Sequence, residues 1–358
     1  MNSSRQLARQ TIALIAAALL GTSLLLVAPA QAAEPVITPG TPTISGTPQY
    51  GKTLTAKPGA WLPADVTLSY QWFRGATPVG TNAATYKLGS SSDVGRPITV
   101  QVTGSRTGTT PVAASSAPTA PVMAARFTNT VRPKISGSSK YGHRLKGSSG
   151  RWSNAVGSYE YRWLRDGKPI RGATGKTYRV GPSDVGAKLR LRVTVRRTGF
   201  VTTSSQSAAV TGQHVRGVRK TVTYSVTTRG KITASLSTFK KLAQQTYDDP
   251  RGWRAMGVRF KRVSKGGDFT LVLSQASKVP SFSSVCSTTY SCRVGRNVII
   301  NQTRWQKATP AWNAKKGTLR NYRHMVVNHE TGHWFERGHA SCGGKGRWHP
   351  SCSNSPRD

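Results

Sequence analysis

An internal repeat constrains the fold of this chain more than any other feature of its sequence. When the chain is shifted against itself by the separation of Trp61 and Trp152, the segment Tyr70–Trp72 aligns with Tyr161–Trp163. Each copy contains short β-rich runs between Gly and Pro turns and closes with a strand of alternating character. The repeat therefore predicts two antiparallel β-sandwiches of about 90 residues each.

The same repeat sets the expected domain boundaries. We expect a first sandwich over residues 34–122 and a second over residues 123–211, with polar linkers near Ala114–Val122 and Thr202–Gln213. The repeated Tyr and Trp residues are expected in the cores, and stacking on carbohydrate is the alternative role. The two copies resemble bacterial immunoglobulin-like modules of secreted surface proteins, which implies a spacer or an adhesive element.

The amino-terminal segment has the parts of a secretory signal peptide, which we expect over residues 1–33. Arg5 and Arg9 precede an apolar run from Ile12 to Val27, and small residues of the A-x-A type follow. We therefore expect a secreted chain that is free or associated with the cell wall. A retained membrane anchor is the competing interpretation, and no later segment is apolar enough to cross a bilayer.

The charge of the chain restricts its partners more than its fold. It contains 52 Lys and Arg residues against 12 Asp and Glu residues, which gives a formal net charge of +40. A balance of this kind predicts an anionic partner. For a secreted chain, a cell-wall polymer or an anionic lipid fits better than nucleic acid, for which no motif is present. A solvated surface that resists aggregation is the alternative.

The sequence pattern changes after the second repeat, which predicts a third domain over residues 212–358. Strands are expected at Lys220–Thr227, Gly257–Val263, Asp268–Ser274 and Asn297–Asn301, and the second and third of these are expected to be buried. An amphipathic helix lies between the first two and must end before Pro250, because proline cannot continue a helix. The pattern is typical of an α+β domain.

The last predicted helix begins after Thr318 and carries the candidate chemistry in the letters HETGH. His329 and His333 are four residues apart, so their rings lie on adjacent turns of one helix face. Two neutral imidazoles bind Zn²⁺, and a neighbouring carboxylate takes a proton from the bound water. We therefore predict His329 and His333 as zinc ligands and Glu330 as the catalytic base. Two core histidines beside an exposed glutamate are the competing interpretation, which buries polar rings.

At this point the third domain resembles a known family. The letters HETGHWFERGH resemble the metzincin signature HExxHxxGxxH, and residues 213–339 resemble an actinobacterial family of secreted proteins with a zinc-peptidase-like domain of unassigned function. The other segments that suggest this family are CRVGRNVIIN, TPAWN and YRHMVVNHETGH. The resemblance implies a metzincin-like (zincin) fold, Zn²⁺ as cofactor, a peptide or protein substrate and His339 as third ligand. It also implies that Asn297–Asn301 is an edge strand along which a peptide pairs.

The chain departs from the signature at two places. Glu336 occupies the position of the family's glycine, which lets the chain leave the helix in a left-handed conformation. We expect Gly338 to supply that turn two residues later, which would alter the approach of His339. No methionine follows Met325, so the methionine turn of the family is missing. Glu336 is a candidate to orient His333 or to act as a substitute ligand, and a solvent-facing glutamate is the alternative.

Four cysteines occur in the last third of the chain: Cys286, Cys292, Cys342 and Cys352. In an oxidising compartment we expect disulfides, and the local pairs Cys286–Cys292 and Cys342–Cys352 are the simplest of three connectivities. A four-thiolate zinc site is the alternative. His349 lies between the last two cysteines and is a candidate substitute ligand or carbonyl-polarising group.

These patterns predict a secreted, zinc-dependent metallopeptidase-like protein whose basic modules hold it near the cell envelope. Two other functions are carried as hypotheses. One is a non-catalytic wall-binding or adhesive protein with a degenerate peptidase fold, and the other is a peptidoglycan amidase with the same zinc chemistry. Zinc binding together with cleavage that depends on Glu330 distinguishes the enzyme from the adhesive protein.

Overall fold

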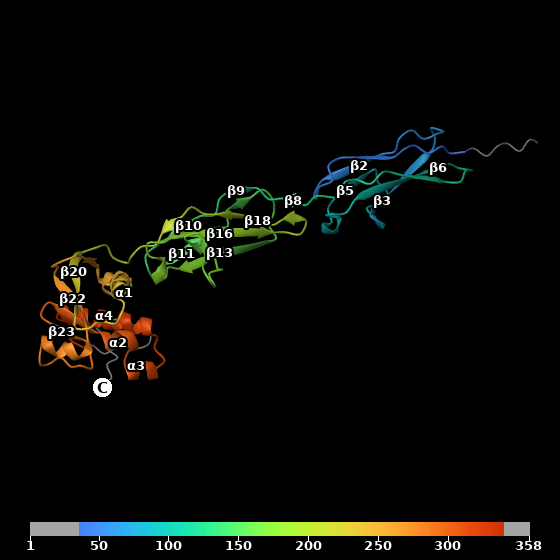
Figure 1. Ribbon diagram of the computed structural model, residues 1–358. Coiled ribbons are helices and arrows are strands. Elements are labelled where there is room, and N and C mark those ends of the chain that lie inside the picture. The colour runs from blue at the N-terminus through green and yellow to red at the C-terminus, as the bar shows by residue number, and fades with distance from the viewer. Residues whose placement is uncertain (1–35, 340–358) are drawn as a thin grey trace, which may run out of the picture. The chain divides into compact units, whose positions relative to one another are not determined.

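The computed structural model describes residues 36–339 of the chain (Figure 1). The expected signal peptide lies outside the described residues, as do Cys342, His349 and Cys352. Contacts among the described residues form two compact units, and the second contains the described residues from Met123 onward. Across the described range, no helix has both the length and the apolar character to cross a membrane.

The first repeat folds into two antiparallel sheets that pack face to face, as the sequence predicts. The strand orders are β1-β2-β5 and β4-β3-β6-β7. The elements are β1 (Thr43–Ser45), β2 (Thr53–Lys57), β3 (Thr67–Arg74), β4 (Thr77–Val79), β5 (Thr85–Lys87), η1 (Ser91–Asp93), β6 (Ile98–Ser105) and β7 (Val112–Ser115). Alternate residues of both sheets form one core, in which Leu54, Trp72 and Val100 are fully buried.

The second repeat has the same construction. Its sheets have the orders β10-β11-β15 and β14-β13-β16-β18, with β19 also paired to β16, and two short pairs, β9-β12 and β8-β17, accompany them. The elements are β8 (Ala125–Arg126), β9 (Asn129–Val131), β10 (Ile135–Gly137), β11 (Arg144–Gly147), β12 (Arg151–Trp152), β13 (Ser158–Arg165), β14 (Lys168–Pro169), β15 (Thr177–Arg179), η2 (Pro182–Asp184), β16 (Lys188–Arg196), β17 (Phe200–Val201), β18 (Thr203–Gln206) and β19 (Val210–Thr211). Leu145, Trp163 and Leu191 are buried in its core.

The two predicted linkers are partly wrong, because both contain strand residues. Strand β7 extends into Ala114–Val122, and β18 and β19 lie inside Thr202–Gln213. Both β7 and β18 lie at the edge of a sheet, where one face of the strand is open to solvent. Such strands carry small polar residues at alternate positions, so their composition resembles that of a linker.

The third domain is built on one mixed sheet of order β21-β20-β22-β24-β23 (Figure 1, yellow to red). The strands are β20 (Lys220–Arg229), β21 (Val258–Arg262), β22 (Phe269–Ser274), β23 (Cys292–Val294) and β24 (Asn297–Asn301). Strand β20 pairs in parallel with β21 and β22, and β22 pairs in parallel with β24. Strand β23 pairs antiparallel with β24. The four strands predicted from the sequence correspond to β20, β21, β22 and β24 and are confirmed, although only Phe260 of β21 is buried.

The helical elements of this domain are α1 (Leu236–Asp248), η3 (Trp253–Met256), η4 (Ala276–Phe282), α2 (Gln302–Lys307), α3 (Pro310–Ala314) and α4 (Leu319–Trp334). Helices α1 and α4 share one core with the sheet, in which Phe239 of α1, Val327 of α4 and Leu271 of β22 are buried. A smaller cluster that includes Val272 of β22 and Val279 of η4 covers the opposite face. The period-two alternation of the strands explains the two-sided burial.

The edge strand of the sheet differs from the expectation. Asn297–Asn301 is β24, an inner strand between β22 and β23, so its prediction as the edge strand is wrong. The two-residue turn Gly295-Arg296 connects it to β23, and Gly295 has a φ of 55°. Turns of this length favour glycine with positive φ. This hairpin makes Cys292–Val294 the edge strand.

Candidate metal centre

Helix α4 positions the candidate catalytic residues. It begins after Thr318, as predicted, because the side-chain hydroxyl of Thr318 accepts a hydrogen bond from the backbone N–H of Asn321 (3.2 Å). Its apolar side packs into the core, and its third and fourth turns carry His329, Glu330 and His333 along a cleft of about 720 Å³. The helix therefore holds three candidate residues on a rigid element of the domain.

The structure brings the three predicted histidine ligands together. Ligand nitrogens of His329, His333 and His339 all lie within 4.8 Å of one another. The Nε2 atoms of His329 and His333 are 3.1 Å apart. The ring of His339 stacks on that of His329, with centroids 5.1 Å apart and planes inclined by 12°. Three imidazoles thus converge on one point, although His339 comes from beyond the helix.

The chain reversal that returns His339 to the helix is centred on Glu336. Beyond the last helical residue, the N–H of Glu336 donates to the carbonyl of His333 (3.0 Å) and the N–H of Arg337 to that of Gly332 (2.9 Å). This pair of bonds is a Schellman motif, which places Glu336 at the left-handed position. Its φ is 59°, so Glu336 itself makes the turn, and the suggestion that Gly338 makes it is wrong.

Replacing Glu336 with glycine is expected to stabilise the third domain by about 1 kcal/mol, because a side chain at a left-handed position strains the backbone and glycine does not. The measurement is urea unfolding of the full chain in the presence of a chelator, which removes any contribution from bound metal. Arg337→Gly is the matched control and should not stabilise, since Arg337 has no positive φ. A less stable Glu336→Gly variant would contradict the strain argument.

The Glu336 side chain is exposed and lines the cleft. Among the described residues, the partner of the His333 Nδ1 atom is the backbone carbonyl of Arg337, at 2.9 Å. That hydrogen bond needs a proton on Nδ1, which leaves the Nε2 lone pair directed toward the other imidazoles. The group that orients His333 is therefore a carbonyl oxygen and not the predicted Glu336 carboxylate.

Glu330 is the buried acid of the site. Its side chain is 6% exposed, it lines the cleft, and among the described residues no hydrogen bond or salt bridge to its carboxyl group is seen. Burial raises the pKa of Glu330 to about 8, since removal from water disfavours the charged form. A cation nearby would oppose this effect and favour the carboxylate.

Burial and neighbouring groups keep the imidazoles of His329 and His333 neutral. The pKa of His329 is lowered to about 4, mainly by burial and in addition by the neighbouring His333 and His339. Burial is also the main reason that the pKa of His333 is lowered, with an additional contribution from Arg293. Neutral imidazoles present lone pairs, and metal binding requires that form.

The residues of this site fit a zinc ion. Three imidazoles on converging side chains, with a carboxyl group that has no partner among the described residues lining the same cleft, make the donor set of zinc sites that keep one position open. Imidazole nitrogens as donors favour zinc over calcium or magnesium, which prefer oxygen ligands. His349 cannot be compared, because it lies outside the described residues.

The cleft has the edge strand β23 on one side. Cys292 and Arg293 of this strand line it, and Trp312 and Lys315 of the α3 region line it as well. The Nε atom of Arg293 is buried without a hydrogen-bond partner among the described residues. The sequence pattern VGRN at 294–297, a two-residue turn with glycine first, is the signal that would have identified this hairpin and hence its edge strand.

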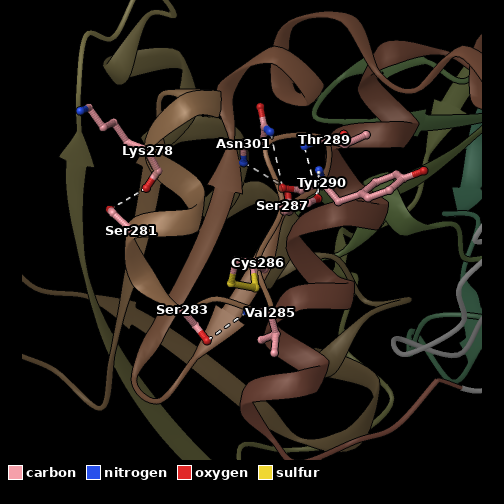
Figure 2. Close-up of a disulfide and its surroundings, with 11 residues drawn as sticks. Lys278, Ser281, Ser283, Val285, Cys286, Ser287, Thr289, Tyr290 and Asn301 are labelled. Atoms are coloured by element: carbon pink, nitrogen blue, oxygen red, sulfur yellow. Dashed lines mark hydrogen bonds between the residues drawn. A yellow bond between two sulfur atoms is a disulfide. The ribbon is translucent and has the colours of Figure 1, made fainter.

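A disulfide fixes the loop beside the edge strand (Figure 2). Cys286 and Cys292 are bonded, with an S–S distance of 2.03 Å, which confirms the first predicted pair and excludes these two as thiolate ligands. The loop between them is also hydrogen-bonded to β24, since the side-chain N–H of Asn301 donates to the carbonyl of Thr288 (2.8 Å). The Ser287 hydroxyl accepts from the backbone N–H of Tyr290 (3.3 Å). The rim of the cleft is thus held in place covalently.

Comparison with known proteins gives few links. A family model described as a protein of unknown function (DUF3152) matches residues 197–353. No curated protein matches the chain. The chain is similar to three N-terminal domains of the Highly Immunogenic Outer Capsid protein of bacteriophage RB49, with 17% identity over 53% of this chain and 65% of that chain and a TM-score of 0.24.

Two further solved structures show comparable similarity. One is a Ca²⁺-stabilised adhesin with which an Antarctic bacterium binds ice (15% identity, 52% of either chain, TM-score 0.25). The other contains the tandem Ig repeats of Dlar (11% identity, 48% of this chain, 95% of that chain, TM-score 0.17). TM-scores this low support no argument about the chain. The fold assignment of the repeats therefore stands on their own sheets and cores.

Proposed function

We propose that this chain is a zinc-dependent hydrolase of the metallopeptidase type with a metzincin-like third domain. The observation that supports it most is the arrangement of α4 and the turn after it. Three imidazoles converge there, and the buried carboxyl group of Glu330, which has no partner among the described residues, lines the same cleft. A carboxyl group buried without a partner is costly for stability, so its presence favours a chemical role.

His329, His333 and His339 would hold the zinc ion. When bound, zinc lowers the pKa of a coordinated water toward ~7 and polarises a carbonyl oxygen. The hydrogen bond from His333 Nδ1 to the Arg337 carbonyl keeps that ring in one tautomer and orientation. His339 depends on the left-handed turn at Glu336 for its approach.

Glu330 would move the proton in this reaction. As a carboxylate it accepts a proton from a water molecule in the cleft on a side-chain oxygen, and it returns that proton to the nitrogen of the departing amine. Burial raises the pKa of Glu330 toward neutral pH. A group whose pKa lies near the working pH can both accept and release a proton within one catalytic cycle.

The edge strand offers a means of holding a peptide substrate. On its side away from β24, β23 has no strand partner in the described part of the sheet. An extended peptide can pair with such an edge through its backbone, which positions a peptide carbonyl without selecting a particular side chain. The disulfide between Cys292 of this strand and the buried Cys286 would keep the strand in place beside the cleft.

The remaining parts of the proposal concern location. We propose a secreted protein that stays near the cell envelope, because a net charge of +40 favours contact with anionic cell-wall polymers. The two sandwiches would then act as a spacer between the envelope and the hydrolase domain.

The test uses the purified full chain, a peptide library and purified cell wall. We expect about one zinc per chain by metal analysis, peptide cleavage that a chelator abolishes, and recovery when zinc is returned. Zinc binding without cleavage would instead favour the non-catalytic adhesive protein. Release of stem peptides from purified wall, with no cleavage of ordinary peptides, would favour the amidase. A chain that binds no zinc would contradict all zinc-dependent functions.

A further inference from the structure

The outer face of the five-stranded sheet in the second module carries a pair of opposed arginines. Arg162 of β13 and Arg192 of β16 are directly opposite each other in the antiparallel register. Both are half-buried. Like charges at opposed positions of a sheet destabilise it, because the side chains are only about 5 Å apart at Cβ. Arg190, two residues before Arg192 on the same strand and face, adds a third positive charge.

Among the described residues, this group forms no ion pair with an acid of the second module. Its acidic residues are Glu160, Asp166 and Asp184. Glu160 pairs with Arg196 (3.5 Å) and Asp184 with Arg165 (2.7 Å). Asp166 accepts a hydrogen bond from the backbone N–H of Lys188 (2.8 Å).

The first module supplies an internal comparison. Its residues equivalent to the arginine pair are Gln71 and Gln101, which face each other in the same register on β3 and β6. Thr99 occupies the place of Arg190. The same sandwich therefore forms without any charge at these positions. The arginines of the second module are not required by the fold, and they carry an electrostatic cost that the first module avoids.

We propose that this face of the second module, formed by Arg162, Arg190 and Arg192, binds a linear polymer of phosphate groups on the cell surface. Guanidinium groups form paired hydrogen bonds with phosphate and carboxylate. Two opposed guanidinium groups suit phosphate better than carboxylate. A single guanidinium already occupies both oxygens of a planar carboxylate, whereas the oxygens of a tetrahedral phosphate point in several directions and can accept from both groups. A third arginine further along the strand favours an extended polymer over a single ion. This inference does not depend on the proposed hydrolase.

The experiment compares matched variants of the full chain in binding to long-chain inorganic polyphosphate. Arg162→Gln with Arg192→Gln reproduces the pair of the first module and should weaken binding at least about 10-fold. The slope of log affinity against log salt should fall by about 1.4, since each lost phosphate contact contributes about 0.7 for a single-stranded polymer. The thermal midpoint of the second module should rise by a few degrees, because the like-charge pair is gone.

The control changes the same charge on the other sheet of the same module. Arg144 and Arg179 are also opposed, on β11 and β15, and both are exposed. Arg144→Gln with Arg179→Gln should weaken binding less than 3-fold. An equal loss in both variants would mean that net charge alone drives binding and would overturn the assignment of the face.

A gain-of-binding variant protects the test against a folding artefact. Installing the pair in the first module, by Gln71→Arg with Gln101→Arg, should raise the affinity for polyphosphate several-fold. No gain there, together with no loss in the Arg162 and Arg192 variant, would overturn the proposal. Tighter binding to anionic lipid vesicles or to polyglutamate than to polyphosphate, with the same dependence on Arg162 and Arg192, would also overturn the choice of phosphate polymer.

Discussion

Replacing Glu330 with glutamine is expected to reduce peptide hydrolysis by about 10³-fold while the zinc content of the full chain stays unchanged. Glutamine has nearly the same shape, but it cannot accept and return a proton, and general acid–base catalysis contributes roughly 10² to 10⁴ to a rate. Metal content and single-turnover cleavage of the best library peptide give the two readouts. Because Glu330 is 6% exposed and has no ionic partner among the described residues, the neutral amide should not lower stability.

The matched control is Glu336→Gln, which makes the same chemical change six residues along the chain at an exposed position that lines the cleft. It should retain most of the activity, since Glu336 does not orient His333. Full activity in the Glu330→Gln protein would remove Glu330 from the mechanism. Loss of zinc from that protein would instead assign the carboxyl group to the metal.

Replacing His329 or His333 with alanine is expected to weaken zinc binding by at least about 100-fold. Loss of a group that merely orients a ligand costs about 10- to 100-fold, so loss of a ligand should cost more. The measurement is a competition titration with a chelating dye. The zinc-dependent increase in unfolding free energy should fall in parallel, because a ligand that binds only the folded state stabilises it according to its affinity.

His324→Ala is the control for this pair. His324 lies on the same helix and is 9% exposed, but it is not one of the three converging imidazoles. Its replacement should lower stability through lost packing and leave zinc affinity unchanged. Equal zinc affinities in the native chain and in the His329→Ala and His333→Ala variants would show that the imidazoles do not hold the metal.

Much of the fold could be predicted because local patterns agree with the tertiary structure. The repeated Trp72 and Trp163 are fully buried in corresponding cores, and Thr318 caps the last helix as its sequence position suggests. The spacing of His329 and His333 predicts adjacent ring positions because helix geometry alone fixes them. These features depend on residues close in sequence.

The parts that could not be predicted depend on long-range pairing or on strained backbone. Strand β23 precedes β24 in the chain but lies outside it in the sheet, and a buried apolar run such as Asn297–Asn301 does not reveal which of its sides is paired. Glu336 in a left-handed conformation contradicts its own local preference, so propensity favoured Gly338 instead. The carbonyl that orients His333 belongs to Arg337, and a backbone group leaves no trace in the sequence.

The disulfide between Cys286 and Cys292 determines when the rim of the cleft becomes fixed. Thiols stay reduced in the cytosol, and the oxidised pair forms outside it. In a chain that is exported as proposed, the rim beside the edge strand would remain untethered during synthesis and become fixed only after translocation. Cytosolic proteins would therefore encounter the chain only before the rim of its cleft is fixed, which would limit their cleavage by the proposed hydrolase.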